Sequence, residues 1–174
     1  MKYKDAVKKS MEMLAEKENV VFIGYNVNFG SQGYGTLKDV PKEKKIETPV
    51  AENLMIGLAT GMALEGYHPV VFFERHDFML NALDGIVNHL SKIEQLSLGE
   101  FAPSVIIRAV IGSRNPLNPG IQHMQDFSRA FKDLVDFPVY TPKTAYEVEE
   151  AYNKAKESKR PVMIIEWRDL YDEE

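Results

Sequence analysis

Short apolar runs alternate along this chain with longer stretches in which apolar residues recur at helical spacing. The apolar runs, each of a length that suits a strand, are Val20–Gly24, Ile46–Thr48, Pro69–Glu74, Ser104–Val110, Pro138–Thr141 and Pro161–Trp167. The amphipathic stretches are residues 3–17, about 50–65, 77–97, about 123–134 and Ala145–Glu157. Buried strands that alternate with amphipathic helices predict an α/β fold of three layers, in which an open, mostly parallel sheet carries helices on both faces.

Two of the predicted helices have a well-defined apolar stripe. In the first helix the stripe consists of Tyr3, Val7, Met11 and Leu14. In the longest predicted helix, residues 77–97, it consists of Leu80, Leu83, Val87, Leu90 and Ile93. Residues that share one face of a surface helix are expected to pack against the sheet.

Two long polar loops interrupt the alternation. The first, Tyr25–Lys45, is rich in glycine, and the second, Gly112–Gln122, is longer than compact domains usually carry without a purpose. Ligands of parallel α/β folds gather beyond the carboxyl ends of the strands. Glu52, Phe78 and His123 each follow a predicted strand, so they are candidates for one site at that edge of the sheet.

The segment Glu47–Asn53 ends one strand and opens a helix. Thr48 is expected to accept a backbone N–H as the N-cap residue, and Pro49 has the fixed φ that suits the first helical position. Glu52 then lies in the first turn, where the helix dipole favours a negative charge. Taken alone, this pattern favours a purely structural interpretation of Glu52 as a helix-start residue.

Composition narrows the classes of function. The 174 residues are 44% hydrophobic and 27% charged, which fits a single globular domain over residues 1–174. The net charge of −5 argues against a nucleic-acid-binding surface. No apolar stretch approaches the length of about 18 residues that a membrane helix needs, and the first residues lack the apolar core of a signal peptide. With no cysteine in the chain, a cytoplasmic location is expected.

Several segments match a known family in their order and spacing. They are Thr48–Glu52, Gly57–Ala63, Glu65–Pro69, Asp77–Asn88 and Gln122–Gln125. Together they resemble the pyrimidine-binding domain of thiamine-diphosphate enzymes, most closely the beta subunit of the 2-oxo acid dehydrogenase decarboxylase component. The resemblance extends over almost the whole chain, to Trp167–Tyr171. It implies the family's pyrimidine-domain fold and thiamine diphosphate as the cofactor.

The resemblance also implies roles for three residues. Glu52 matches the glutamate that activates the cofactor by a hydrogen bond to its aminopyrimidine ring, and Phe78 matches the aromatic residue that stacks on that ring. His123 matches the histidine that faces the reacting carbon and binds or protonates the substrate, which suits an imidazole. Without the resemblance, a core position is the better interpretation of Phe78. His123 is then equally well a helix-start residue bonded to the backbone.

The chain departs from the beta subunits just before Phe78, where Glu74, Arg75 and His76 stand in place of apolar or small residues. Arg75 and His76 are candidates for binding the distal end of an acidic or phosphorylated substrate. Alternatively, they pair with Glu74 and Asp77 in a solvated cluster of charges. The sequence does not decide between these two interpretations.

A second departure concerns the part of the active site that this sequence does not contain. The glycine-rich motif that holds magnesium and the diphosphate in these enzymes is absent, and the family's beta subunits continue into a second α/β domain. The resemblance therefore implies a partner chain, an alpha-type diphosphate-binding subunit that holds most of the Mg²⁺ site. The chain is expected to be active only with this partner, in a homodimer or a dimer of heterodimers.

The preferred prediction is a subunit of a multichain thiamine-diphosphate enzyme, classed as a lyase, transferase or oxidoreductase. Such an enzyme decarboxylates a 2-oxo acid and transfers the resulting acyl or aldehyde group. A first alternative is a split transketolase-type ketol transferase that acts on a ketose. A second is a non-catalytic homologue retained for assembly or regulation, against which the joint presence of Glu52, Phe78 and His123 argues.

Gly57 and Gly61 lie four positions apart in the helix predicted over about 50–65, so they share a face. Each interior glycine costs a helix about 1 kcal/mol relative to alanine. The flat face that they create either accommodates the domain's own sheet or contacts another subunit. An active site formed between chains favours the second.

Overall fold

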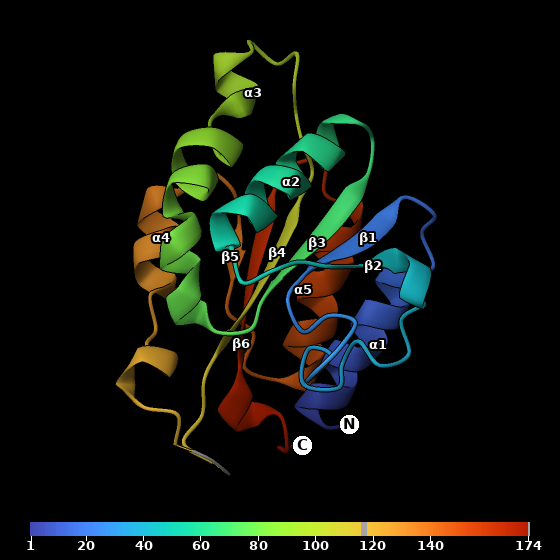
Figure 1. The fold of residues 1–174 in the computed structure, drawn as a ribbon, viewed down its shortest axis with the longest axis vertical. Helices are drawn as coiled ribbons and strands as arrows, with labels where there is room; N and C mark the ends of the chain where they lie inside the picture. The colour runs from blue at the N-terminus through green and yellow to red at the C-terminus, as the bar shows by residue number, and fades with distance from the viewer. Residues whose placement is uncertain (116–117, 174) are drawn as a thin grey trace.

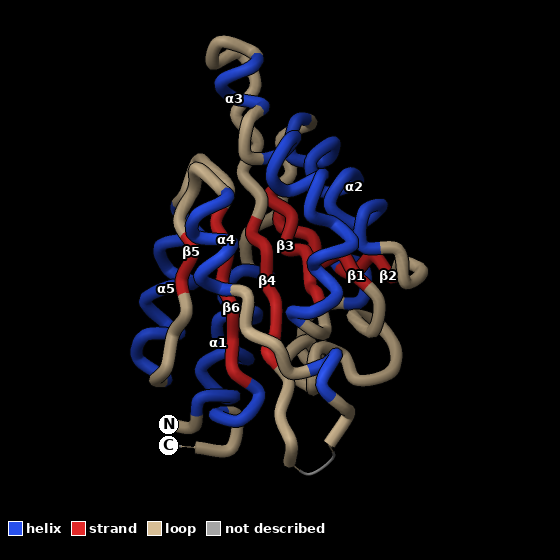
Figure 2. The backbone as a smooth tube through the Cα atoms, turned by 90° about the vertical axis from the view of Figure 1, so that its left-hand side faces the viewer, coloured by secondary structure: helices blue, strands red, loops and turns tan. Residues whose placement is uncertain are grey.

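The strands form one six-stranded sheet in the order β2-β1-β3-β4-β6-β5, and every neighbouring pair is parallel. Their bounds are β1 Val20–Gly24, β2 Lys45–Glu47, β3 His68–Phe73, β4 Ile106–Ile111, β5 Val139–Tyr140 and β6 Val162–Trp167. The computed structural model describes residues 1–115 and 118–173. Figure 2 shows the strands in this order across the view. The predicted α/β fold with a parallel sheet is confirmed.

Helices cover both faces of the sheet. They are α1 Tyr3–Ala15, α2 Glu52–Leu64, α3 Ile93–Leu96, α4 Ser128–Leu134 and α5 Ala145–Glu157. One core cluster joins α1 and α5 to one face of the strands, and a second joins α2 and α4 to the other (Figure 1). Successive strand residues alternate between these two clusters, since side chains of a strand point to opposite faces. Within the described ranges, no helix is long and apolar enough to cross a membrane.

The long helix predicted over residues 77–97 is broken into three pieces, which corrects that prediction. The chain forms a 3₁₀ helix over His76–Ala82, a π-helix over Gly85–Leu90, and then α3. The apolar residues buried along it are Met79, Ala82, Ile86 and Leu90, whereas Leu80 is 46% exposed. Of the predicted stripe, Leu90 lies in the core and Leu83 and Val87 pack against it. The stripe is wrong for Leu80, because 3₁₀ and π turns change the angle between successive side chains.

A tertiary contact lies at the start of the π-helix. Gly85 packs on α2, where a Cβ atom at this position would lie 2.5 Å from Cγ2 of Ile56. Only a residue without a side chain allows this approach. The helical axis is therefore set by the neighbouring helix rather than by local propensity.

The N-cap predicted for α2 is also wrong. The helix starts at Glu52, and its N-cap position is occupied by Ala51, which makes no side-chain cap. Thr48 instead extends the pairing of β2 with β1, because its N–H donates to the carbonyl of Gly24 at 2.9 Å. Pro49 therefore precedes the helix by several residues. Glu52 still occupies the first turn, as predicted.

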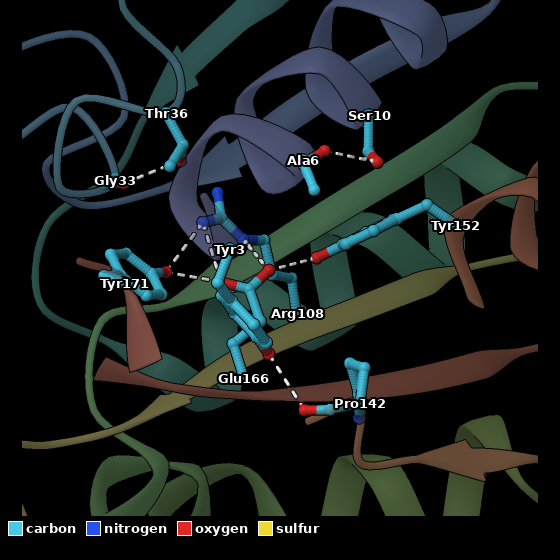
Figure 3. Close-up of polar contacts among 10 residues, drawn as sticks. All are labelled: Tyr3, Ala6, Ser10, Gly33, Thr36, Arg108, Pro142, Tyr152, Glu166 and Tyr171. Atoms are coloured by element: carbon cyan, nitrogen blue, oxygen red, sulfur yellow. Dashed lines mark hydrogen bonds and ion pairs between the residues drawn. The ribbon is translucent and has the colours of Figure 1, made fainter. Parts of the chain in front are cut away.

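An ion pair that the sequence analysis did not predict lies beneath α1 and α5 (Figure 3). Arg108 on β4 donates through Nε to Oε1 of Glu166 on β6 at 2.8 Å, and through Nη2 to Oε2 at 3.0 Å. The hydroxyls of Tyr152 and Tyr171 donate to the same carboxylate. Burial, and then the charge of Glu166, raise the pKa of both tyrosines well above the ordinary value, so they remain donors.

Candidate functional site

The candidate site lies at the end of the sheet where the segments that follow β2, β3 and β4 begin. Glu52 begins α2 directly after β2, Phe78 lies in the 3₁₀ helix after β3, and His123 ends a short 3₁₀ turn, Ile121–His123, after β4. This is the carboxyl end of the strands, where α/β folds place their ligands. The predicted helix over residues 123–134 begins later than expected, at Ser128.

Glu52 carries a buried carboxylate whose hydrogen bonds to neighbouring side chains are long. It is 5% exposed. The hydroxyl of Tyr25 donates to Oε1 at 3.5 Å, and the amide of Asn81 donates to Oε2 at 3.4 Å. Both bonds are long, so the carboxylate retains capacity for a further partner. Burial, followed by the charge of Glu52, raises the pKa of Tyr25, which keeps its proton for donation.

Phe78 and His123 are in contact. Their rings lie edge to face with centroids 5.2 Å apart and planes at 79°. Both side chains are half-buried, and Nδ1 of His123 is buried without a hydrogen-bond partner among the described residues. Phe78 lies three residues before Asn81, so one 3₁₀ helix connects the Glu52 carboxylate with the His123 ring. Glu52 and His123 thus both contact the 3₁₀ helix that contains Phe78.

His76 lies outside this group, in the core. The side chain is fully buried, with ring centroids 5.9 Å from Phe127 and 5.5 Å from Phe131. Burial lowers the pKa of His76 to about 4, against smaller opposing effects of Asp126 and Asp77. A neutral imidazole without an exposed atom has no surface to offer a substrate. The expected contact between His76 and a substrate does not fit this position.

Arg75 is half-buried and lies over the ring of Tyr34, with Cζ 5.1 Å from the ring centroid. A second guanidinium, that of Arg168, lies over the same ring at 5.5 Å. The carboxylate of Glu74 is occupied by Asn26 at 2.9 Å and by a serine hydroxyl. Arg75 donates through Nη1 to the backbone carbonyl of Glu74 at 3.3 Å. In the described part of the chain, the carboxylate of Glu74 forms no ion pair with Arg75, which does not favour the alternative of a charge cluster.

Sequence reasoning missed four residues around the site. They are Tyr25, Tyr34, Asn81 and Arg168. A signal existed for two of them, since Tyr25 directly follows β1 and Arg168 directly follows β6. Both therefore stand at carboxyl ends of strands, as the three predicted residues do.

Comparison with known families gives a match over nearly the whole chain. The family model described as "Transketolase, pyrimidine binding domain" matches residues 1–173. The chain is 28% identical over 165 residues to the pyruvate dehydrogenase E1 component subunit beta of Cyanidium caldarium, covering 92% of this chain and 50% of that protein. It is 24% identical over 177 residues to the 2-oxoisovalerate dehydrogenase subunit beta of Bacillus subtilis, covering 98% and 53%.

Solved structures show the same fold at lower identity. A split-gene transketolase, described as an inactive beta4 tetramer, superposes with a TM-score of 0.75 at 20% identity, covering 97% of this chain and 52% of that one. Transketolase from Campylobacter jejuni superposes with a TM-score of 0.72 at 14% identity, covering 95% and 25%. The chain spans about half the length of the curated relatives named above.

Proposed function

Because the chain belongs to the family of transketolase pyrimidine-binding domains, we propose that it supplies the pyrimidine-binding half of a thiamine-diphosphate site in a multichain enzyme. The reaction we favour is decarboxylation of a 2-oxo acid followed by transfer of the acyl or aldehyde group. The observation that carries the proposal is the buried carboxylate of Glu52, which begins a helix at the carboxyl edge of a parallel sheet and makes only long hydrogen bonds.

The residues present fit the cofactor. A buried carboxylate whose hydrogen bonds are 3.4 and 3.5 Å long can exchange a weak partner for a ring nitrogen. The half-buried ring of Phe78 offers an aromatic surface in the segment that also touches Glu52. Such underused polar groups in the interior are a mark of binding sites.

Each residue then has a defined task. Glu52 would hold the aminopyrimidine ring and hold or release a proton at its carboxylate, and Phe78 would support the face of that ring. His123 stands beside Phe78, where its imidazole can hold or move a proton on the substrate. When bound, thiamine diphosphate supplies a thiazolium carbon that acts as a nucleophile toward a carbonyl. The protein's contribution is to orient, to shield from water and to transfer protons.

We propose an alpha-type partner that binds the diphosphate and Mg²⁺, in a homodimer or a dimer of heterodimers in the cytoplasm. The similarity to proteins described as beta subunits supports a heteromeric enzyme. The face of α2 next to Glu52 supports a subunit contact as well. A Cβ atom at Gly57 or Gly61 would have no neighbour within 4 Å, while Leu54 and Leu58 are 53% and 36% exposed. These glycines therefore do not accommodate the chain's own sheet.

A second candidate, ketol transfer by a split transketolase-type enzyme, is favoured by one observation. Two guanidinium groups, those of Arg75 and Arg168, lie over the ring of Tyr34 at the carboxyl ends of β3 and β6. Two cations held at a site edge suit a doubly charged phosphate. A phosphorylated ketose is thus the alternative to a 2-oxo acid as the substrate.

The test is to purify the tagged chain alone and together with the partner that it retains from its source cells. Calorimetry with Mg²⁺ should show tight binding of thiamine diphosphate only for the complex. The complex is then assayed for release of CO₂ from pyruvate and branched 2-oxo acids, and for ketol transfer between phosphorylated sugars. A complex that binds no thiamine diphosphate, or that has neither activity, would point to a non-catalytic homologue and overturn the proposal.

A further inference from the structure

Two segments of the site run side by side in opposite directions, and their contacts fall in register. Three consecutive residues after β3 contact three alternate residues in the segment after β4. The pairs are Phe78 with His123, Asp77 with Gln125, and His76 with Phe127. The segment His123–Phe127 therefore packs along the segment His76–Phe78.

Asp77 makes the polar contact in the middle of this register. Asp77 is only 7% exposed. One oxygen, Oδ1, accepts from the backbone N–H of Gln125 at 3.2 Å and from its side-chain amide at 2.9 Å. Hydrogen bonds to an ionised acceptor are stronger than neutral ones, and burial strengthens them further. The backbone is thus fixed two residues after His123.

The backbone of His123 is fixed at its own carbonyl as well. Gly112, the residue after β4, lies under it so closely that a Cβ atom there would be 1.9 Å from the carbonyl oxygen. Only glycine permits such an approach. The loop therefore passes directly over the end of β4 before it reaches Asp77.

We infer that Asp77 is a positioning residue for His123. Through Gln125 it holds the loop that presents the imidazole, and Phe78, the neighbour of Asp77, contacts that imidazole from the same segment. Asp77 acts through another residue, and the inference rests on the proposed catalytic role of His123. Loops of this kind open locally at low free energy unless such contacts hold them.

The test compares Asp77→Ala with Asp77→Asn, whose amide oxygen can still accept both hydrogen bonds from Gln125. Asp84→Ala is the matched control, since Asp84 is an exposed carboxylate a few residues further along. Amide hydrogen exchange over residues 121–126 and the ring NMR signals of His123 are measured on the full chain. Asp77→Ala should speed that exchange and shift those signals, while Asp77→Asn and Asp84→Ala should not.

In the complex with its partner, Asp77→Ala should lower kcat about 10- to 100-fold, as expected when a catalytic group is misplaced by about 1 Å. The affinity for thiamine diphosphate should stay unchanged, because Glu52 is not disturbed. Asp77→Asn should recover most of the loss. Should Asp77→Ala fail to fold, Gln125→Ala removes one of the two hydrogen bonds and should shift exchange and kcat in the same direction.

Unchanged exchange over residues 121–126 in Asp77→Ala overturns the inference. Faster exchange with unchanged kcat also overturns it, because the hydrogen bonds between Asp77 and Gln125 would then not serve catalysis. A wild-type complex without thiamine-diphosphate-dependent turnover would instead refute the proposed function. In that case the exchange and ring signals still report separately whether Asp77 holds His123.

Discussion

Arg108 and Glu166 face each other from adjacent strands with no exposed side-chain surface on either residue. Two parallel hydrogen bonds join the guanidinium to the carboxylate, which also accepts from two tyrosine hydroxyls. The guanidinium lies over the ring of Phe72 at 4.8 Å. Removing one partner of such a pair leaves the other charge buried without compensation.

We therefore expect Glu166→Gln to lower the free energy of unfolding by about 3–5 kcal/mol, the usual cost of breaking a buried ion pair. Urea unfolding followed by circular dichroism measures this change. Glu157→Gln is the control, since Glu157 forms an ion pair with Lys17 at the surface with 73% of its side chain exposed. That pair should contribute less than about 1 kcal/mol. Equal effects of the two substitutions would contradict the importance of the buried pair.

The buried imidazole of His76 predicts a dependence of stability on pH. Its pKa is lowered from 6.5 to about 4 by burial in the folded chain. Between these values the unfolded chain binds a proton that the folded chain excludes, so the free energy of unfolding falls as the pH is lowered from 6.5 to 4. The full loss amounts to about 3 kcal/mol.

His76→Phe places a ring without titratable atoms between Phe127 and Phe131 and should remove this part of the pH dependence. Unfolding in urea at several pH values between 4 and 7 provides the measurement. The pKa of His68 is also lowered by burial, so the difference between wild type and variant isolates His76. Parallel pH profiles for the two proteins would show that His76 does not carry the effect.

The exposed glycine face of α2 gives a prediction about association. Gly61→Leu meets no atom of the chain itself within 4 Å of its Cβ, so circular dichroism should change little. Gly61→Ala should stabilise the helix by about 1 kcal/mol. If this face contacts another subunit, Gly61→Leu should weaken association in sedimentation experiments, whereas Asn153→Leu, on exposed α5 surface, should not. Unchanged association for Gly61→Leu would place the interface elsewhere.

The centre of the sheet could be predicted from sequence because β1, β3, β4 and β6 are mainly apolar runs that both helical layers bury. Helix α5 was predicted with the observed bounds, and its Thr144 cap accepts from the N–H of Glu147 at 3.2 Å. The helix over residues 77–97 failed because a tertiary contact decides its shape, namely the packing of Gly85 on Ile56. No local pattern contains that contact.

The site was predictable only in part for a similar reason. Resemblance singled out Glu52, Phe78 and His123, and the structure joins them through one 3₁₀ helix. The supports of these residues come from distant segments, such as Asp77 and Gln125, which lie 48 positions apart. The buried ion pair escaped notice because its two residues read as isolated polar positions in strands whose adjacency the sequence does not reveal.

The central claim is that the carboxylate of Glu52 exchanges a proton with the cofactor. Its most direct test is the turnover of the reconstituted complex with Glu52→Gln. This change keeps the shape of the side chain but removes its charge, so the fold should survive and turnover should fall by about 10²–10⁴. Glu65→Gln, an exposed carboxylate at the other end of α2, should leave turnover unchanged. A loss of less than about tenfold for Glu52→Gln, a barrier change below about 1.4 kcal/mol, would contradict the account and return Glu52 to the role of a helix-start residue.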